Sequence, residues 1–145
     1  MEAGQDNLDA CVLSVVIVNW NVCELLQSCL RSGYQSWRGD AGALEVIVVD
    51  NASHDGSAEM VRAAFPQVIL IENERNVGFT VGNNQAIRRS HGRYVMLLNP
   101  DTEMVGDALS AMVEYMNLRL DVGVVGPKLL NPDGTVQSSR RRFPT

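Results

Sequence analysis

The stretch Arg93-Tyr94-Val95-Met96-Leu97-Leu98-Asn99-Pro100-Asp101-Thr102 decides the expected fold. Its first half is a short apolar run that predicts a fully buried β-strand, because a lone helix needs more residues. The run stops at an Asn-Pro-Asp turn, which can continue neither a helix nor a central strand. Ligands of open α/β sheets bind just beyond the carboxyl ends of the strands. Asp101 is therefore expected at the mouth of a binding crevice, and an ordinary strand-ending turn is the alternative.

Further apolar runs alternate with amphipathic segments along the chain. Buried strands are predicted at residues 13–18, 44–49, 68–71 and 122–125. Helices are predicted at residues 22–33, from the loop at 50–57 to 65, after 79 and ending near 92, and at 107–120. A tight turn at 131–134 reads as a hairpin tip. This alternation predicts an α/β fold, with a mostly parallel sheet and helices on both faces.

The apolar spacing also assigns the inward face of two helices. In the first, Asn21 is expected to be the N-cap, Glu24 to complete a capping box and Gly33 to end the helix. Its inward residues are expected to be Val22, Leu25, Leu26, Cys29 and Leu30. Those of the last helix are expected to be Leu109, Met112, Tyr115 and Met116. Each helix thus presents an apolar stripe for packing against a sheet.

Composition and charge exclude several classes of protein. A formal net charge of -5 argues against general nucleic-acid binding, and no apolar run reaches the ~18 residues of a membrane span. The odd count of three cysteines, without a CxxC pair, indicates structural thiols in a reducing compartment. Residues 1–12 read as a polar, acidic and disordered lead-in without the features of a secretory signal, so a cytoplasmic location is expected.

Polar residues follow the carboxyl ends of three predicted strands, at Asn19, at Asp50, and at Asn99 with Asp101. In a doubly wound sheet these ends converge on one crevice. A carboxylate there can accept a hydrogen bond from a nucleobase or a ribose hydroxyl, or it can hold Mg²⁺ or Mn²⁺, which bridges a pyrophosphate. Other sites fit less well, since the chain has no GxGxxG after its first strand, no Walker A motif and no GxSxG elbow.

Two histidines and one arginine run remain outside this set. His54 and His91 are isolated, and we interpret them as solvated or capping residues and not as catalytic ones. The run Arg140-Arg141-Arg142 reads as a solvated end, with a phosphate- or membrane-facing role as the alternative.

Four motifs, in this order, resemble family 2 glycosyltransferases of the GT-A fold. They are Val-Ile-Val-Asn-Trp-Asn at 16–21, Val-Val-Asp-Asn-Ala-Ser-His-Asp-Gly-Ser at 48–57, Asn-Val-Gly-Phe at 76–79 with Asn84, and Leu-Leu-Asn-Pro-Asp-Thr at 97–102. The likeness is greatest to the bacterial branch with rhamnosyltransferases of surface-polysaccharide synthesis, which residues 126–134 also resemble. It covers about residues 13–143.

The resemblance implies a nucleotide-sugar-binding role for the first two motifs. Val18, Asn19 and Trp20 would line the nucleobase and ribose pocket, with plain packing as the alternative for Trp20. Asp50 would bind the base. The residues that would shape its loop are Asn51, Ser53 and Asp55. For Asp50 and Asp55, simple loop capping is the alternative.

The later motifs would complete the donor site. Asn76, Gly78 and Asn84 would bring backbone and side chain against the nucleotide, with simple turn formation as the alternative for the first two. Asp101 corresponds to the last carboxylate of the metal-binding DxD motif. The sequence departs from that motif because Asn99 replaces its first Asp, which weakens the expectation of metal dependence without removing it.

The activity implied is inverting transfer of a sugar from a nucleoside-diphosphate sugar, with dTDP- or UDP-linked donors favoured, to a hydroxyl of a saccharide or lipid-linked saccharide. A divalent cation, Mg²⁺ or Mn²⁺, would stabilise the departing diphosphate, and a carboxylate would deprotonate the acceptor. In this family that base lies in the later half, and the sequence offers no candidate for it. Residues 13–145 are therefore expected to be the nucleotide-sugar-binding part of a GT-A domain whose C-terminal half is absent.

The resemblance also implies a setting and leaves alternatives. The full-length protein would act in cell-surface polysaccharide synthesis, in the cytoplasm and peripherally at the inner face of the membrane. A non-catalytic nucleotide-sugar-binding or interaction module is the alternative from another class. A nucleotidyltransferase-type domain fits less well, because the first strand is followed by Asn19-Trp20-Asn21 and not by a Gly-rich basic loop.

Overall fold

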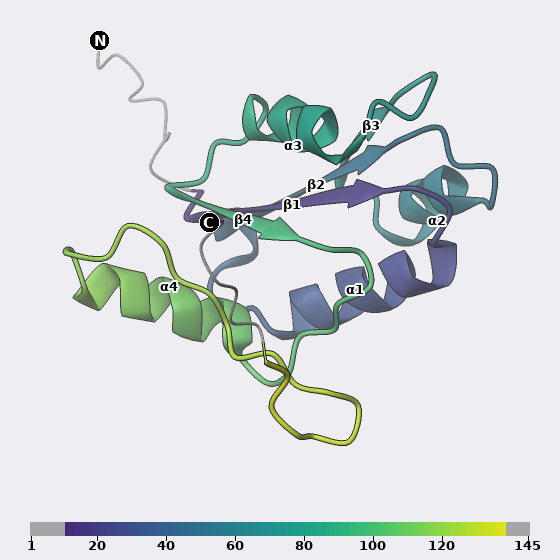
Figure 1. The fold of residues 1–145 in the computed structure, drawn as a ribbon. Coiled ribbons are helices and arrows are strands. Elements are labelled where there is room, and N and C mark those ends of the chain that lie inside the picture. Colours follow the sequence, from purple (N-terminus) through teal and green to yellow (C-terminus); the bar gives the residue numbers. More distant parts are fainter. Residues whose placement is uncertain (1–10, 139–145) are drawn as a thin grey trace, which may run out of the picture.

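A four-stranded parallel sheet, in the order β3-β2-β1-β4, forms the centre of the computed structural model, which describes residues 11–138 (Figure 1). The strands are β1 (Leu13–Asn19), β2 (Leu44–Asp50), β3 (Ile69–Glu72) and β4 (Tyr94–Leu98). The helices are α1 (Cys23–Gln35), α2 (Ser57–Ala64), α3 (Phe79–Ile87) and α4 (Ala108–Leu118), with a short 3-10 helix η1 (Ala41–Ala43) before β2. The predicted parallel α/β order through residue 120 is thus confirmed.

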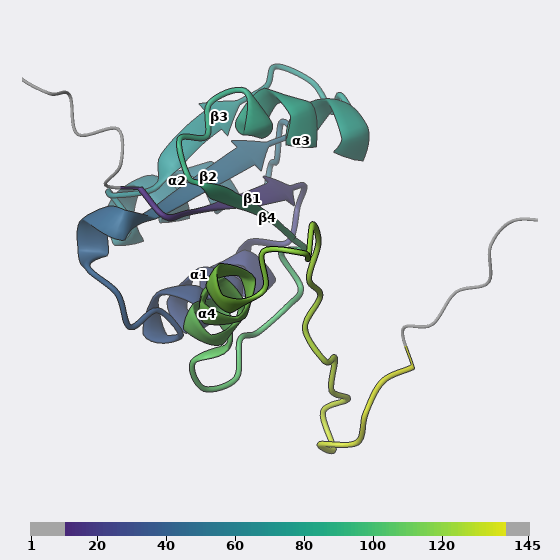
Figure 2. The ribbon, with the colours of Figure 1, turned by 90° about the vertical axis from the view of Figure 1, so that its left-hand side faces the viewer.

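The winding direction of the sheet reverses between β1 and β4. The connections through α1 and α2 carry the chain from β1 to β2 and β3, and these helices lie on one face of the sheet together with α4 (Figure 1). Helix α3 then leads from β3 back to β4 across the opposite face, as Figure 2 also shows. This arrangement follows from the right-handedness of parallel crossovers. It places a topological switch point between the carboxyl ends of β1 and β4.

Alternation along the central strands divides the core into two layers. Leu13, Val15 and Ile17 of β1 pack with the buried side chains of α1, α2 and α4, including Leu26 and Cys29. The opposite layer, under α3, consists of Val16, Ile47, Val49 and Ala86. Period-2 alternation in β1 and β2 therefore supplies both faces of the sheet with apolar side chains.

Strand β4 is buried on one face only, so the prediction of a fully buried strand is wrong for it. Val95 is 43% exposed and Leu97 is 52% exposed, whereas Met96 and Leu98 pack into the larger core. The physical reason is that α3 packs over β1 and β2, and no other described helix lies on that face (Figure 1). The outer edge of β4 also has no paired strand within residues 11–138.

The predicted start and end of the first helix are wrong in detail. Asn21 is not the N-cap: its backbone is left-handed, with φ of 54°, and Val22 precedes the helix without a side-chain capping bond. The Asn21 side chain instead accepts the backbone N–H of His54 at 2.8 Å. Gly33 lies inside the helix, which ends at Gln35. Leu25, predicted to face inward, is 48% exposed because Leu26 occupies the inward position.

The chain after β4 differs most from the prediction. On α4, Val113 is buried in place of Tyr115, which is 44% exposed. Residues 122–125 do not form the predicted fifth strand and pair with none of the strands in the described part of the chain. The turn at 131–134 is confirmed by the bond from the Gly134 N–H to the Asn131 carbonyl at 2.8 Å, and a single antiparallel bridge joins Leu130 to Val136.

Three predictions concern the two ends of the chain and the absence of a membrane-spanning segment. Cys11 and Val12 belong to the sheet margin, since the N–H groups of Arg93 and Tyr94 donate to their carbonyls at 3.3 and 3.0 Å. The rest of the lead-in and the arginine run at 140–142 lie outside the described residues. Among the helices of residues 11–138, none has the length and apolar character that crossing a bilayer requires.

Candidate functional site

The carboxyl ends of β1 and β2 form a buried polar pair. Asn19 and Asp50 face each other in the strand register. The Asn19 side-chain N–H donates to Asp50 Oδ1 at 2.8 Å and to Ser53 Oγ at 3.2 Å, and the Ser53 backbone N–H donates to Asp50 Oδ2 at 2.8 Å. Asn19 is fully buried and Asp50 is 3% exposed. The structure thus brings together three predicted site residues and fixes both oxygens of the Asp50 carboxylate.

One buried atom in this group is left without a partner. Oδ1 of Asn19 makes no hydrogen bond to any described residue. An unsatisfied buried polar atom costs about 1–3 kcal/mol, so native structures rarely leave one without a partner. An N–H or O–H group of a ligand that reached this edge would therefore gain from pairing with Asn19.

A second loop is tied to the end of β2 through amide side chains. Asn51 Nδ2 donates to the Gly78 carbonyl at 3.4 Å, and Asn73 Nδ2 donates to Asn51 Oδ1 at 2.9 Å. The Asn76 side chain accepts the Gly78 N–H at 2.9 Å, which closes a turn in which Gly78 has φ of 84°. Sequence reasoning missed Asn73 and its partner Gln85, which exchange two bonds of 2.9 Å. Their separation of twelve residues gives no local signal.

Asp55 holds the start of two helices. Its carboxylate accepts the Cys23 N–H at 2.8 Å and the N–H and hydroxyl of Ser57 at 3.1 and 2.6 Å. Burial is the largest single effect and raises its pKa, but these hydrogen bonds together outweigh it and leave the pKa below its ordinary value. Asp55 is therefore ionised at neutral pH and favourably placed at the helix N-termini.

Asn99 and Asp101 lie on the loop that leaves β4 beside β1. The last paired residues of these two strands are Ile17 and Leu98. Both predicted ligands are exposed, and within residues 11–138 the Asp101 carboxylate has no hydrogen bond or ion pair of its own. The loop is closed by the Thr102 N–H, which donates to the Asn99 carbonyl at 3.2 Å. The structure thus presents Asp101 to solvent at the switch point.

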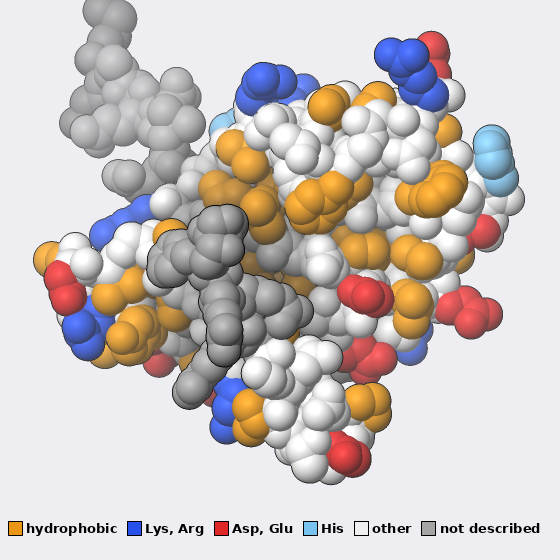
Figure 3. Space-filling view, viewed as in Figure 1, with side chains coloured by type: hydrophobic (Ala, Val, Ile, Leu, Met, Phe, Trp, Pro, Cys, Tyr) orange, Lys and Arg blue, Asp and Glu red, His pale blue; other side chains and the backbone are white. Residues whose placement is uncertain are grey.

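The chemistry of these donors fits a hard divalent cation that is shared with a diphosphate. No group of three or more His, Cys, Asp or Glu side chains that could hold a metal occurs in the described part of the chain. Mg²⁺ is nevertheless commonly held by one or two carboxylates together with phosphate oxygens and waters. Figure 3 shows acidic side chains gathered on the side toward which the strands point in Figure 1. Their negative charge favours a cation at this edge.

The remaining predicted residues lie around this edge with different exposure. Trp20 is 56% exposed, so it is not a core residue. Val18 is partly buried under α3, where a Cβ on Gly82 would lie 3.0 Å from its methyl carbons. Asn84 is exposed on α3 and has no side-chain hydrogen bond to a described residue. These three positions thus flank the buried pair of Asn19 and Asp50 without joining its network.

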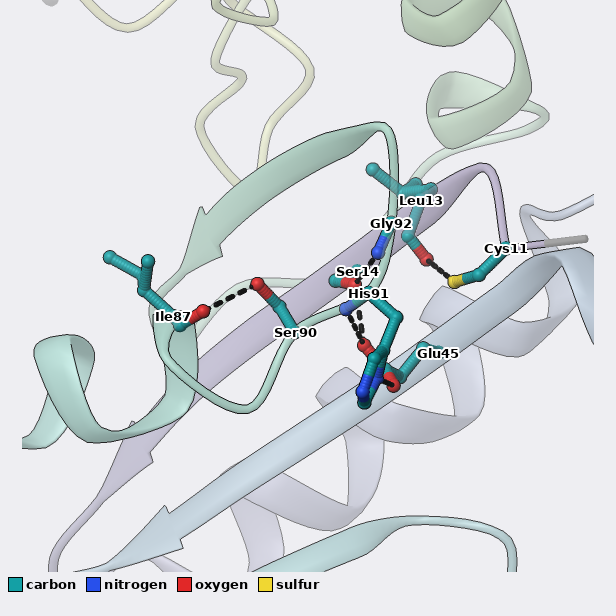
Figure 4. Close-up of polar contacts among 8 residues, drawn as sticks. All are labelled: Cys11, Leu13, Ser14, Glu45, Ile87, Ser90, His91 and Gly92. Atoms are coloured by element: carbon teal, nitrogen blue, oxygen red, sulfur yellow. Dashed lines mark hydrogen bonds and ion pairs between the residues drawn. The ribbon is translucent and has the colours of Figure 1, made fainter. Parts of the chain in front are cut away.

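A separate polar cluster lies at the amino ends of the strands (Figure 4). Ser14 Oγ donates to Glu45 Oε2, His91 Nδ1 lies 2.8 Å from Glu45 Oε1, and the Gly92 N–H donates to Ser14 Oγ at 2.8 Å. The carboxylate lies between the hydroxyl and the imidazole, so the order is not that of a nucleophile–base–acid triad. The cluster joins the loop before β4 to β1 and β2. His91 therefore has a structural role in this loop.

A cavity of about 590 Å³ lies elsewhere, at the outer edge of β4. Its walls are β4, the apolar side of α4 and residues 123–127. Among residues 11–138, Arg93 is its one charged lining residue and no carboxylate lines it. The cavity is therefore unsuited to hold a cation, and the candidate site remains at the carboxyl edge.

The fold and the polar edge together define an α/β protein with a parallel sheet and a cluster of polar residues at its switch point. Residues 14–144 match the family described as "Glycosyl transferase family 2". The chain therefore belongs to glycosyl transferase family 2.

Relatives agree with this membership. The chain is 27% identical over 132 residues to the putative teichuronic acid biosynthesis glycosyltransferase TuaG of Bacillus subtilis. The matched region covers 86% of this chain and 50% of TuaG. It is 26% identical over 113 residues to an N-acetylglucosaminyl-diphospho-decaprenol L-rhamnosyltransferase of Mycobacterium tuberculosis, covering 70% of this chain and 37% of that protein. The chain thus spans half or less of these relatives.

Solved structures share the fold. TarS 1–349 of S. aureus superposes with a TM-score of 0.68 at 20% identity, over 75% of this chain and 33% of TarS, and TarS has been solved with UDP and with UDP-GlcNAc. The mannosyltransferase PcManGT of Pyrobaculum calidifontis, solved with GDP-Man and Mn²⁺, gives a TM-score of 0.65 at 27% identity, over 72% of this chain and 32% of PcManGT. The GT-A fold predicted from the sequence is thus confirmed.

Proposed function

We propose that this chain binds the nucleoside-diphosphate sugar of an inverting glycosyltransferase at the carboxyl edge of its sheet. The observation that carries the proposal is the position of the solvent-facing Asp101 beside the buried pair of Asn19 and Asp50 at the switch point. The base and ribose would lie against the β1 and β2 ends, and the diphosphate against the loop after β4. The UDP and GDP-Man complexes of TarS and PcManGT support a nucleotide-sugar ligand.

The side chains divide the work of binding. Asn19 would form the buried floor of the nucleotide pocket, and Asp50, held by Asn19 and Ser53, keeps the end of β2 in place. Asp101, with Asn99 as a neutral companion, would hold Mg²⁺ or Mn²⁺. The cation, when bound, supplies positive charge that stabilises the departing diphosphate.

We also propose the donor, the acceptor and the cellular location of the reaction. The donor would be dTDP- or UDP-linked. The acceptor would be a saccharide or lipid-linked saccharide of a surface polysaccharide, as the names of the Bacillus and Mycobacterium relatives suggest. Residues 13–145 would be the donor-binding part of a longer GT-A protein. That protein would act in the cytoplasm, peripherally at the inner face of the membrane, and its catalytic base would belong to the acceptor half.

A non-catalytic binding module is the second candidate. It is favoured by one observation, namely that Asn99 stands two residues before Asp101, so that the loop after β4 offers a cation one carboxylate at these two positions. In this case the chain would bind the donor without transferring the sugar. Assay of sugar transfer by the full-length protein separates the two candidates, since only the enzyme turns the donor over.

Calorimetric titration tests the donor site. The chain is titrated with dTDP, UDP and GDP, each with Mn²⁺ and then with a chelator, and Asp101→Ala is titrated alongside. We expect Mn²⁺-dependent binding of at least one diphosphate, which Asp101→Ala weakens by about tenfold or more, since a ligand to the shared cation is lost. Glu103→Ala, which removes a neighbouring exposed carboxylate, is the matched control and is expected to bind as the wild type does. Absence of binding by the wild type would overturn the proposal.

A further inference from the structure

A row of small polar side chains on α1 contacts the chain segment that follows β4. Cys29 and Ser32 of α1, and Ser36 directly after its last residue, are spaced so that they share one side of the helix. All three are bonded to backbone atoms of that segment. The contacts run from Cys29 Sγ to the Asn99 carbonyl at 3.6 Å, from the Met104 N–H to Ser32 Oγ at 3.0 Å, and from the Leu109 N–H to Ser36 Oγ at 3.0 Å.

These contacts bracket the exposed Asp101. The Cys29 contact lies two residues before it and the Ser32 contact three residues after it. The hydrogen bond within the loop, from Thr102 to Asn99, closes the turn but does not attach it to the rest of the molecule. Hydrogen bonds to α1 therefore set where the Asp101 turn stands relative to the sheet.

Ser32 is the central residue of this row. Its hydroxyl donates to the Cys29 carbonyl at 3.0 Å and accepts the Met104 N–H at 3.0 Å, so both of its roles are fixed. The partner of Ser32 in the loop is a backbone N–H. Ser32 therefore fixes the course of the loop backbone, independently of the side chains that the loop carries. Loss of the hydroxyl would leave the part-buried Met104 N–H without this acceptor.

We propose that Ser32 is a positioning residue for diphosphate binding: through the Met104 N–H it fixes the Asp101 turn to α1 and thereby its position relative to the sheet. This inference rests on the proposed function, in which Asp101 is the residue that holds the cation. The contacts to α1 give the exposed turn a fixed position. The internal bond from Thr102 to Asn99 alone would close the turn without fixing where it lies. Ser32 itself touches neither nucleotide nor cation.

The test compares two serines that make the same kind of bond at opposite ends of β4. Ser32→Ala removes the acceptor of Met104 N–H after β4, and Ser14→Ala removes the acceptor of Gly92 N–H before β4 (Figure 4). Ser32→Thr keeps a hydroxyl at the position and serves as the rescue. Each variant is titrated with UDP and Mn²⁺, and amide hydrogen exchange is measured over residues 99–104.

We expect Ser32→Ala to weaken Mn²⁺-dependent UDP binding about tenfold and to speed exchange over residues 99–104. Ser14→Ala should lower stability but leave the affinity within about twofold, because its bond lies at the other end of the strand. Ser32→Thr should restore binding. Unchanged affinity in Ser32→Ala, or an equal loss in both alanine variants, would overturn the inference.

The two proposals fail in different ways. If the wild type binds no diphosphate, the proposed function fails, and hydrogen exchange then decides the inference alone. Faster exchange over residues 99–104 in Ser32→Ala but not in Ser14→Ala would still support a positioning role. Exchange unchanged from the wild type would overturn it.

Discussion

Burial determines how the cysteine thiols of this chain react. It raises the pKa of Cys29 to about 12, and this residue is fully buried, whereas Cys11 and Cys23 are partly exposed. The thiolate is the reactive form of cysteine. Iodoacetamide at mildly alkaline pH is therefore expected to label Cys11 and Cys23 in the folded protein and to spare Cys29. Mass spectrometry of the peptides measures this, with urea-unfolded chain as the control. Rapid labelling of Cys29 in the folded chain would contradict its burial between α1 and the sheet.

Glu45 is the carboxylate that the amino edge of the sheet stabilises. Burial raises its pKa, but hydrogen bonds from Ser14 and His91 outweigh burial and leave the pKa below its ordinary 4.5. A carboxylate with a lowered folded-state pKa stabilises the native state above its unfolded pKa, and this contribution is lost as the pH falls through the folded pKa.

Glu45→Gln is therefore expected to lower the free energy of unfolding by about 1–2 kcal/mol at neutral pH, since bonds to a charged acceptor are lost. The difference from the wild type should shrink as the pH falls below 4.5. Urea unfolding at neutral and acidic pH measures both quantities, and Glu74→Gln, an exposed glutamate, is the control. A difference that stayed constant with pH would contradict the assignment.

The positions of the site residues could be predicted, but their contacts could not. Asn19, Asp50 and Asp101 follow apolar runs, and a turn-forming sequence marks each strand end locally. The bond between Asn19 and Asp50 depends on the register between β1 and β2, which is a long-range property. The same holds for Ser32, whose helical position is visible in the sequence while its partner Met104 is not.

At the scale of elements, β4 shows that a continuous apolar run does not by itself determine how many faces of a strand are buried. A continuous apolar run predicts burial on both faces, but the second face of β4 lacks a covering helix, and Leu97 is 52% exposed where Leu98 is 7% exposed. The sequence of β4 does not indicate over which strands the preceding helix, α3, packs. For the same reason residues 122–125 have the composition of a strand but no partner strand within the described chain.

Neighbouring leucines of β4 should therefore differ sharply in their contribution to stability. Leu98→Ala removes a side chain from the larger core and is expected to lower the free energy of unfolding by about 2–5 kcal/mol. Leu97→Ala removes a side chain that is half in solvent and should change it by about 0.5 kcal/mol or less. Thermal or urea unfolding of both variants gives the comparison. Equal losses would show that the outer face of β4 is covered in solution.

At the scale of the whole molecule, the two edges of the sheet have different tasks. The amino edge pairs its polar groups internally, as Ser14, Glu45 and His91 do (Figure 4). The carboxyl edge leaves Asn19 Oδ1 without a partner among residues 11–138 and presents Asp101 to solvent. Polar groups left unpaired within the fold are what a ligand site requires. The central claim is therefore that nucleotide and cation meet at the carboxyl edge.

The measurement that tests this claim most directly is nuclear magnetic resonance of the chain with UDP and Mn²⁺, whose unpaired electrons broaden nearby amide signals. We predict broadening at residues 99–102 and at the ends of β1 and β2, near Asn19 and Asp50, while Ser14, His91 and Gly92 at the opposite edge keep sharp signals. Asp101→Ala should remove the effect. Broadening centred at the amino edge or at the cavity beside β4, or its persistence in Asp101→Ala, would contradict the account.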